Sequence, residues 1–339
     1  LLTGSAGYLG AHLARHLLEQ SGCRLHLVVR APSAEAARER VAERLAHYFG
    51  SELLTRHASR VAVHAGELAA ERLGLPDGAY DQLAGSVEAI VHAAANVRHY
   101  GPYADFHRDN VVATQRVLEL ARAGRPKELH HVSTLSVAMG DVAERPVLLF
   151  TEDDLDVGQS TDSPYLRSKL EAERALAAAR AQGVRASVYR VGNLTPAHHA
   201  TRLQANLGEN AFFQVLRVFV SLGVVPSGVD EAALTWVDHT ASAILELARH
   251  EALADRTFHL KNPHILRLAQ ALAAPELGLD LEVLSLQALV EELLVRLDMP
   301  PFRSHIEALL LHLGFLAQQE LHTRAVVAAA RTDAWLERL

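Results

Sequence analysis

The sequence predicts an α/β fold: a doubly wound parallel sheet with helices on both faces, followed by a smaller, mostly helical part. Two observations support this prediction. Short apolar runs alternate with longer amphipathic stretches from the first residue to about residue 190, as strands alternate with helices in a parallel sheet. Three glycines, Gly4, Gly7 and Gly10, separate the first apolar run from the first amphipathic stretch.

The alternation assigns the elements in order. Expected strands lie at Leu1–Leu2, Leu25–Arg30, Arg60–His64, Ala89–Ala94, Leu129–Ser133 and Ala186–Val191. Expected helices lie at Ala11–Gln20, Ala34–Tyr48, Asn110–Arg122 and Pro164–Gln182. After Gly192 the pattern loosens into a loop-like stretch, an apolar helix and two short strands, at Thr195–Asn210, Ala211–Leu222, Leu234–Val237 and Thr257–Leu260. We expect the last of these to return to the main sheet, and the leucine-rich sequence from His264 on to be mostly helical.

Composition excludes several classes of protein. The chain has 339 residues, of which 49% are hydrophobic, so it can bury a large core as one domain or two closely joined ones. A net charge of -7 offers no basic surface for nucleic acid, and no apolar run reaches the roughly 18 residues that span a membrane. Cys23 is the single cysteine, which excludes a disulfide framework and favours a reducing, cytoplasmic setting. Because the chain starts inside an apolar strand, we expect it either to be a domain of something longer or to lack its leading residues.

The glycine loop predicts a dinucleotide site. Gly4 permits the tight turn after the strand, Gly7 lets the backbone approach a pyrophosphate, and Gly10 lets the helix pack closely on the strand. This is the Rossmann-type arrangement, in which the phosphates meet the helix N-terminus. The candidate cofactor contacts in this loop are Thr3, Gly4, Ala6, Gly7, Tyr8, Leu9 and Gly10.

The end of the second strand indicates which dinucleotide binds. Arg30 stands where NAD enzymes usually carry an acidic residue, and an arginine suits the 2′-phosphate of NADPH. Arg40 is either a second clamp on that phosphate or part of a solvated helix face. Glu67 and Leu68, after the third strand, are placed to meet the adenine. The fourth strand ends in small residues, which can let the ribose and nicotinamide lie against the backbone. Those small residues are Ala93, Ala94 and Ala95.

The chemistry is predicted by Tyr165 and Lys169, which lie one turn apart on one face of a helix. A cationic lysine favours the phenolate, so it would lower the tyrosine pKa and make Tyr165 a usable acid or base for carbonyl reduction. A hydroxyl is also needed to bind the carbonyl oxygen. Ser133 and Thr134 end the fifth strand at the carboxyl edge of the sheet, and we choose Thr134, with Ser133 as the alternative. Alone, a Tyr–Lys pair at this spacing is common; its place after the fifth strand, downstream of the glycine loop, favours catalysis.

Together these residues resemble a known family. The chain is similar to extended short-chain dehydrogenase/reductases, and more narrowly to the terminal thioester reductase domains of nonribosomal peptide and polyketide synthetases and the reductase domains of carboxylic acid reductases. The stretches that carry the resemblance are Leu2–Leu9, Leu27–Ala31, Gly66–Ala69, Ile90–Val97, Pro102-Tyr103, Asn110-Val111, His130–Val137, Tyr165–Lys169, Tyr189–Leu194 and Phe258–Pro263. They cover most of the chain to about residue 265.

The resemblance implies a reaction and a partner. An acyl or peptidyl chain would arrive as a thioester on the phosphopantetheine arm of a carrier domain, and NADPH would deliver hydride to its carbonyl carbon. Thr134 and Tyr165 would bind the developing oxyanion, and Lys169 would hold the nicotinamide ribose. The products are an aldehyde and the free carrier thiol, and a second NADPH can carry the aldehyde to an alcohol. Further cofactor contacts implied by the resemblance are Asn110, Ser133, Val191, Gly192, Asn193 and Leu194.

The sequence departs from the family pattern at several positions. Glu67 stands where the family usually has aspartate, and Val191 replaces a common proline. Thr195-Pro196 replaces the usual Thr-Gly, so the loop on the substrate side is expected to differ. Leu170 follows the lysine where a large aromatic residue is frequent.

We divide the chain into an NADP-binding domain, residues 1–200 with 234–262 returning to it, and a substrate-binding, mostly helical subdomain, 201–233 with 263–339. We expect a monomeric domain of a larger synthetase, with no metal site, because the His12/His16 pair lacks a carboxylate partner. Two alternatives remain open. Another extended reductase, such as a fatty acyl-CoA reductase or a sugar-nucleotide epimerase, is one, although Arg30 argues against an epimerase. A non-catalytic NADP-binding regulator is the other, although such proteins tend to lose the tyrosine or lysine.

Overall fold

A computed structural model describes residues 1–98, 100–198, 200, 202–227, 231–232, 234–272, 274–297, 299, 303 and 323–339. Within these residues, seven strands form one sheet in which every neighbouring pair is parallel. Their spatial order is β12 (Thr257–Leu260), β7 (Ala186–Val191), β5 (Glu128–Thr134), β4 (Ala89–His92), β1 (Leu2–Thr3), β2 (Leu25–Val29) and β3 (Val61–Ala65). The doubly wound parallel sheet is therefore confirmed, and so is the return of Thr257–Leu260 to it.

The strand order reverses at β1, which pairs with β2 on one side and β4 on the other. In open α/β sheets, ligands bind in the crevice beyond the carboxyl ends of the strands at such a reversal. Thr3 lies opposite His92 at the end of this pair, so the glycine loop after β1 and the alanines after β4 leave the sheet side by side.

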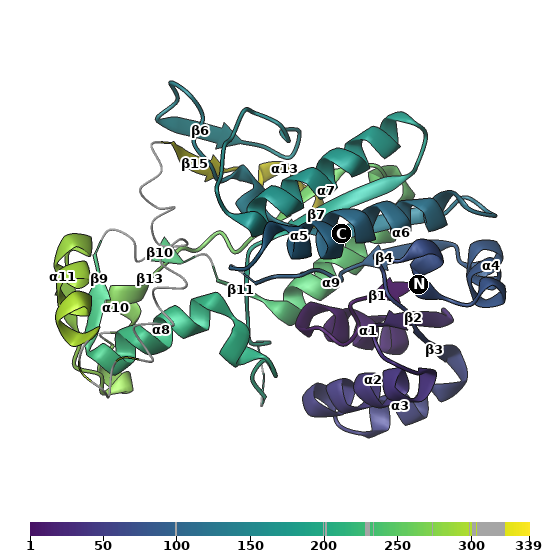
Figure 1. Ribbon diagram of the computed structural model, residues 1–339, viewed down its shortest axis with the longest axis horizontal. Helices are drawn as coiled ribbons and strands as arrows, with labels where there is room; N and C mark the ends of the chain where they lie inside the picture. The colour runs from purple at the N-terminus through teal and green to yellow at the C-terminus, as the bar shows by residue number, and fades with distance from the viewer. Residues whose placement is uncertain are drawn as a thin grey trace.

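Helices cover both faces of the sheet (Figure 1). One face carries α1 (Tyr8–Gln20), α2 (Ala34–Phe49) and α9 (Val237–Ala248), and the other carries α4 (Asp77–Ser86), α6 (Ala113–Arg122) and α7 (Pro164–Ala181). Of two short helices, α3 (Glu52–Arg56) follows α2 in the chain and α5 (Tyr103–Phe106) comes before α6. The helix predicted at Asn110–Arg122 starts inside a π-helical turn over His107–Val112 and continues as α6 from Ala113. The chain is already helical before it, since α5 starts directly after Pro102.

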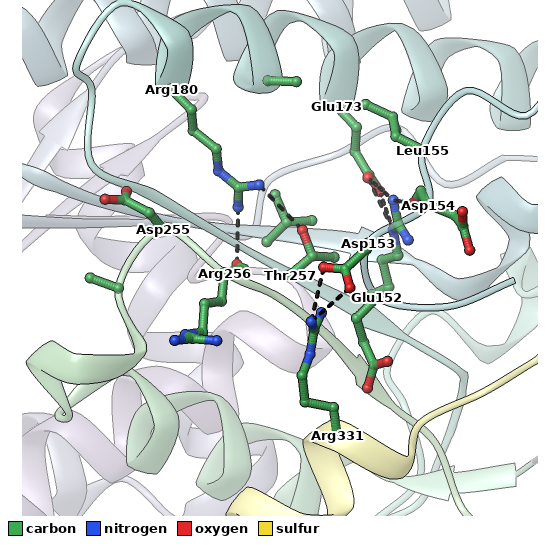
Figure 2. Close-up of a pocket in the computed structure, with 14 residues that line it drawn as sticks. Glu152, Asp153, Asp154, Leu155, Glu173, Arg180, Asp255, Arg256, Thr257 and Arg331 are labelled. Carbon is green, nitrogen blue, oxygen red and sulfur yellow. Dashed lines mark hydrogen bonds and ion pairs between the residues drawn. The ribbon is translucent and has the colours of Figure 1, made fainter.

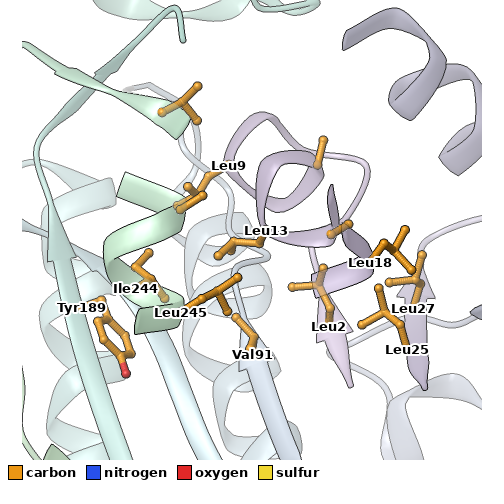
Figure 3. Close-up of a cluster of buried hydrophobic side chains, with 14 of the residues drawn as sticks. Leu2, Leu9, Leu13, Leu18, Leu25, Leu27, Val91, Tyr189, Ile244 and Leu245 are labelled. Atoms are coloured by element: carbon orange, nitrogen blue, oxygen red, sulfur yellow. The ribbon is translucent and has the colours of Figure 1, made fainter. Parts of the chain in front are cut away.

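The core beneath α1 joins segments from both ends of the main domain. Leu13 and Leu18 of α1 and Ile244 of α9 are at most 2% exposed. Figure 3 shows Leu18 beside Leu27 of the sheet and Ile244 beside Tyr189 at the other end of the cluster. Burying a side chain of this size contributes roughly 1.5–3 kcal/mol. Because α9 follows residue 234 in the chain, the contact between α1 and α9 ties the returning segment firmly to the glycine loop.

A second cluster lies away from the main sheet, on the left of Figure 1. It contains α8 (Ala211–Leu222), α10 (Leu268–Leu272), α11 (Leu286–Leu297) and the parallel strands β9 (Val224–Pro226) and β14 (Glu282–Leu284). Two further pairs connect neighbouring loops: β8 (Asn193–Thr195) with β11 (Leu234–Trp236), and β10 (Glu231–Ala232) with β13 (Leu266–Arg267). The described part of 263–339 thus contains the short strands β13 and β14 as well as helices.

The C-terminal segment lies at the edge of the main sheet rather than on the α8–α11 cluster. Strand β15 (Arg324–Val327) pairs in parallel with β6 (Val147–Phe150), and α13 (Ala330–Leu336) packs against β12. No helix within the described ranges is both long enough and apolar enough to cross a membrane.

The tight contact between α1 and its loop makes Gly10 a sensitive position. A Cβ at Gly10 would lie 2.0 Å from the carbonyl oxygen of Gly4, so Gly10→Ala must push α1 off the turn. We expect a loss of about 1–3 kcal/mol in the free energy of unfolding, measured by urea denaturation.

The matched control is Gly22→Ala, because a Cβ there meets no atom within 4 Å. It should change the free energy of unfolding by less than about 1 kcal/mol. Equal losses in the two variants would contradict the packing argument.

Candidate active site

The glycine loop forms a cradle that only glycine fits. Gly4 has a φ of +76°, and a Cβ on it would lie 2.6 Å from the backbone of Ala93 and Ala94. Gly7 is the N-cap of α1, where no side chain caps the helix and no acidic residue occupies the first turn. The first N–H groups of α1 therefore remain available to an anion, as a pyrophosphate requires.

Two side chains hold this loop against β4. The Thr3 hydroxyl lies 2.7 Å from Nδ1 of His92 and accepts a hydrogen bond from Ala94 N at 3.3 Å. The hydroxyl of Ser5 is fully buried and has no hydrogen-bond partner among the described residues. An orphaned hydroxyl beside an uncapped helix N-terminus fits a site that binds phosphate groups. The residues present thus fit a dinucleotide.

The residues expected at the adenosine end converge after β2. Arg30 makes an ion pair with Glu67 through Nε at 2.7 Å and with Asp109 at 3.1 Å. These carboxylates raise the pKa of Arg30 against the effect of burial, which lowers it. Arg40 donates from Nη1 to the carbonyl oxygen of Arg30 at 2.8 Å, which fixes the end of β2. Arg30, Arg40 and Glu67 are all exposed or partly exposed, so a ligand can reach them; a 2′-phosphate would compete with Glu67 and Asp109 for Arg30.

Thr134, Tyr165 and Lys169 meet at the carboxyl end of β5. Helix α7 starts at Pro164, capped by the Ser163 side chain, which accepts from Leu166 N at 3.4 Å. Tyr165 therefore lies in the first turn, where its phenol hydrogen-bonds Thr134. One turn further on, Lys169 donates from Nζ to the Val132 carbonyl oxygen at 2.9 Å.

Burial dominates the ionisation of both α7 side chains. It raises the pKa of Tyr165 to about 12, against the hydrogen bond from Thr134, which lowers it. It lowers the pKa of Lys169 to about 8, against the charge of Glu173, which raises it. The pKa of Tyr165 is therefore raised rather than lowered as expected, because burial outweighs the hydrogen bond with Thr134. Tyr165 is a phenol at neutral pH and is suited to donate a proton or a hydrogen bond.

Asn110 links the loop after β4 to α7. It is 2% exposed, donates to the Asn96 carbonyl oxygen at 3.0 Å and to Ser168 Oγ at 2.8 Å, and accepts from Asn96 N at 2.7 Å. It lies in the π-helical turn, a feature that is frequent at functional sites. The Asn110 amide thus makes its hydrogen bonds within the protein, and these position the loop that contains Ala93, Ala94 and Ala95.

Ser133, the alternative to Thr134, points elsewhere. Its hydroxyl is buried and donates to Glu173, while Thr134 hydrogen-bonds Tyr165. The structure thus favours Thr134 as the hydroxyl near the reacting oxygen and gives Ser133 no side-chain contact with the expected cofactor region.

The other candidates border the same crevice. Tyr8 donates from its hydroxyl to the Thr195 carbonyl oxygen at 3.1 Å, which joins the glycine loop to β8. The side chains of Leu9 and Val191 are 8% exposed and belong to the core, so only their backbone can face a ligand. The remaining expected contacts are at least partly exposed at strand ends and turns: Ala6, Leu68, Gly192, Asn193 and Leu194.

Several buried groups near Lys169 were given no role in the site from the sequence. His92 and His131 face each other with ring centroids 5.2 Å apart, and both pKa values are lowered by burial and by Lys169. Glu173 pairs with Arg190 inside the protein. The spacing of Glu173, four residues after Lys169, was the available signal for it; the two histidines lie within apolar strands and gave none.

The parallel sheet, the glycine cradle and the Thr134–Tyr165–Lys169 arrangement define an NAD(P)-dependent reductase of the extended short-chain dehydrogenase/reductase type. Residues 2–244 match the model of the NAD-binding family described as "Male sterility protein", and the chain belongs to that family.

Named relatives are larger proteins. The chain is 31% identical over 293 residues to one of the subunits of linear gramicidin synthase from Brevibacillus parabrevis, a match that covers 86% of this chain and 6% of that protein. It is 36% identical over 257 residues to isonitrile lipopeptide synthase of Streptomyces coeruleorubidus, covering 73% of this chain and 16% of that protein. The crystal structure of the terminal R domain from the myxalamid PKS-NRPS biosynthetic pathway superposes with a TM-score of 0.87 at 28% identity, over 99% of this chain and 84% of that one. The chain therefore spans only a small share of the length of its curated relatives.

Lys169 should make stability depend on pH in a defined direction. Between about pH 8 and 10.5 the amine is neutral in the folded protein and charged in the unfolded chain, so the unfolded state binds more protons and stability rises with pH. Relative to Lys169→Met, the wild type should gain up to about 3 kcal/mol across this range, measured by urea unfolding at each pH.

Leu170→Met is the control, since the neighbouring position is also buried but does not titrate. Its difference from the wild type should stay constant with pH. A constant difference for Lys169→Met as well would contradict a depressed lysine pKa.

Proposed function

We propose that this chain reduces an acyl or peptidyl thioester, carried on the phosphopantetheine arm of a carrier domain, to an aldehyde with NADPH as the hydride donor. The observation that carries the proposal is the Thr134–Tyr165 hydrogen bond beside buried Lys169 at the carboxyl edge of β5. Two hydroxyl groups that lie together in this way support a site for a carbonyl oxygen.

The carrier partner is inferred from the relatives. Both curated relatives are named as synthases, and the superposable crystal structure is named a terminal R domain of a PKS-NRPS pathway. Matches that cover 6% and 16% of these proteins fit one domain within a multidomain assembly. We infer that this chain likewise receives its substrate from a carrier domain, as a monomeric domain of a larger cytoplasmic synthetase.

The proposed cofactor site uses the two ends of the crevice. Gly4, Gly7 and Gly10 with the start of α1 would hold the pyrophosphate. Arg30 and Arg40 would hold the 2′-phosphate, which is the reason for proposing NADPH rather than NADH. Lys169 would bind the nicotinamide ribose. The backbone of Val191, Gly192, Asn193 and Leu194 and that of Ala93, Ala94 and Ala95 would border the ribose and nicotinamide.

The remaining roles belong to the protein's own side chains. NADPH, when bound, supplies the hydride that becomes the aldehyde hydrogen. Thr134 and Tyr165 hydrogen-bond the thioester oxygen and stabilise the negative charge that develops there, and Tyr165 supplies the proton, because it is a phenol at neutral pH. The resulting hemithioacetal loses its carrier sulfur as a thiol and leaves the aldehyde. One NADPH and one proton are consumed for each thioester reduced to aldehyde and free thiol.

Removal of the phenol hydroxyl tests the reaction directly. Tyr165→Phe should lower kcat for NADPH oxidation with an acyl-phosphopantetheine thioester by about 100-fold or more, because the proton donor is lost. Absorbance at 340 nm follows NADPH, and mass spectrometry of the products shows whether aldehyde and free thiol appear together.

Tyr80→Phe serves as the matched control, since Tyr80 is buried in the core on the α4 side of the sheet. It should leave kcat within about twofold, as expected for a change away from the site. Binding of NADPH by the wild type without turnover of any thioester, including a carrier-bound one, would contradict the proposed reaction and favour a regulatory protein.

Cofactor choice depends on Arg30 in this proposal. Arg30→Ala should raise the KM for NADPH by about tenfold or more, because a charged hydrogen bond to the 2′-phosphate is lost, and should change the KM for NADH little. Arg24→Ala, an exposed arginine just before β2, is the control and should change neither. Parallel losses for both cofactors in Arg30→Ala would contradict recognition of the 2′-phosphate.

A further inference from the structure

Glu173 continues the line of site residues along α7. Tyr165, Lys169 and Glu173 are spaced four residues apart, so they share the face that meets β5. Lys169 donates to the Val132 carbonyl oxygen, and the next residue of β5, Ser133, donates its hydroxyl to Glu173. The helix therefore contacts successive residues of one strand through successive turns.

Glu173 is a fully buried carboxylate with a fixed counter-ion. It is 3% exposed and pairs with Arg190 of β7, which is 1% exposed. Arg190 reaches Glu173 Oε2 through Nε at 3.0 Å and through Nη2 at 2.7 Å, an arrangement that fixes the orientation of both groups. Figure 2 shows Glu173 projecting from α7 among the residues that line the neighbouring pocket. Burying two charges in this way carries a desolvation penalty, so apolar packing would hold a helix on a sheet more favourably.

Arg190 is itself held from two further segments. Its Nη1 lies 3.0 Å from Nε2 of His259 on β12, and its Nη2 donates to the Asp154 carbonyl oxygen at 2.8 Å. His259 in turn contacts the C-terminal segment through the Ala328 carbonyl oxygen and through its own N–H, which donates to Thr332 Oγ1 at 3.0 Å. The chain of contacts runs from the C-terminal segment to Glu173, beside a cavity of about 470 Å³ that Glu173 and Arg190 help to line.

The titratable groups around Lys169 come from four elements, β4, β5, α7 and β7. His92 of β4 and His131 of β5 are buried, and burial keeps their pKa values low, so they are neutral at pH 7. Glu173 of α7 is the group that favours the charged amine. Beyond Glu173 lie the guanidinium groups of Arg190 of β7 and Arg180 of α7; burial lowers the pKa of Arg180 although the charges of Asp255 and Glu173 oppose the shift. Among the described residues, Glu173 thus supplies the negative charge that Lys169 experiences in an otherwise neutral or positive surrounding.

We propose that Glu173, oriented by Arg190 and Ser133, is the positioning residue that keeps the Lys169 side chain charged and in contact with Val132 of β5. The binding of the cofactor ribose by Lys169 is part of the proposed function, and this role rests on it. The electrostatic link between Glu173 and Lys169 is independent of the proposed function. Arg190 acts on Lys169 only through Glu173, because it holds the Glu173 carboxylate in the orientation in which that group also accepts the hydrogen bond from Ser133.

The chain offers a direct readout, because it has only three lysines, Lys127, Lys169 and Lys261. Lysine labelled with ¹³C at Cε gives three NMR signals, which lysine-to-arginine variants at Lys127 and Lys261 assign. Titration of the whole 339-residue chain without substrate then follows the Lys169 amine. Glu173→Gln keeps the shape and the hydrogen-bond acceptor but removes the charge, so the pKa of Lys169 should fall by about one unit or more.

Two variants make the result specific. Glu171→Gln removes a carboxylate from the same helix, where it pairs with Arg167 at the surface, and should leave the Lys169 titration in place. Glu173→Asp retains the charge but is shorter, so it should lower the pKa of Lys169 by less than Glu173→Gln does. A purely structural role predicts the reverse order, since glutamine matches the shape of glutamate better than aspartate.

An unchanged Lys169 titration in Glu173→Gln, or an equal shift in Glu171→Gln, overturns the proposal. If Glu173→Gln does not fold, Glu173→Asp decides, because a measurable fall in the Lys169 pKa is expected there and no fall overturns the link. In active enzyme, the alkaline limb of the kcat–pH profile should move to lower pH with the same variants. A shifted titration in a chain that reduces no thioester would leave the electrostatic link standing while the proposed function fails.

Discussion

The contact between helix α7 and strand β5 is the interaction on which the candidate active site depends. Three side chains at successive turns of the helix, Tyr165, Lys169 and Glu173, engage the last three residues of the strand through a phenol, an ammonium group and a carboxylate. Each contact is polar and buried, so displacing the helix would leave charged or hydrogen-bonding groups without partners. Such losses cost more than the contacts contribute, which makes the arrangement rigid.

The glycine cradle supplies the second constraint, and it acts through the absence of side chains. Gly4 and Gly10 allow β1, β4 and α1 to approach so closely that a single Cβ would collide with backbone atoms. The start of α1 is thereby brought to the point where the strand order reverses, with its N–H groups uncapped. The same close approach brings α1 against α9, so the cofactor crevice and the core of the domain are stabilised together.

Burial is the reason why the ionisation of Tyr165 and Lys169 differs from what their spacing predicts. The spacing predicts a tyrosine activated by a nearby lysine, yet the pKa of Tyr165 rises to about 12 and that of Lys169 falls to about 8. Tyr165 is thus kept as a proton donor, which suits reduction of a carbonyl. The charge of Lys169 then depends on Glu173, and the orientation of Glu173 depends on Arg190, which the C-terminal segment supports through His259.

Apolar periodicity and the need for glycine are local properties of a chain, so the sheet and the glycine cradle could be predicted without a structure. The grouping of Thr134, Tyr165 and Lys169 could also be predicted, because helical spacing and the end of a strand are local features too. The pattern of residues did not reveal that Ser133 turns to Glu173, that Arg30 is shared between Glu67 and Asp109, or that strand β15 returns to β6. Those contacts join residues that are far apart in the chain. They emerge only on folding, since burial and the partners of a charged group are set by whatever the folded chain brings against it.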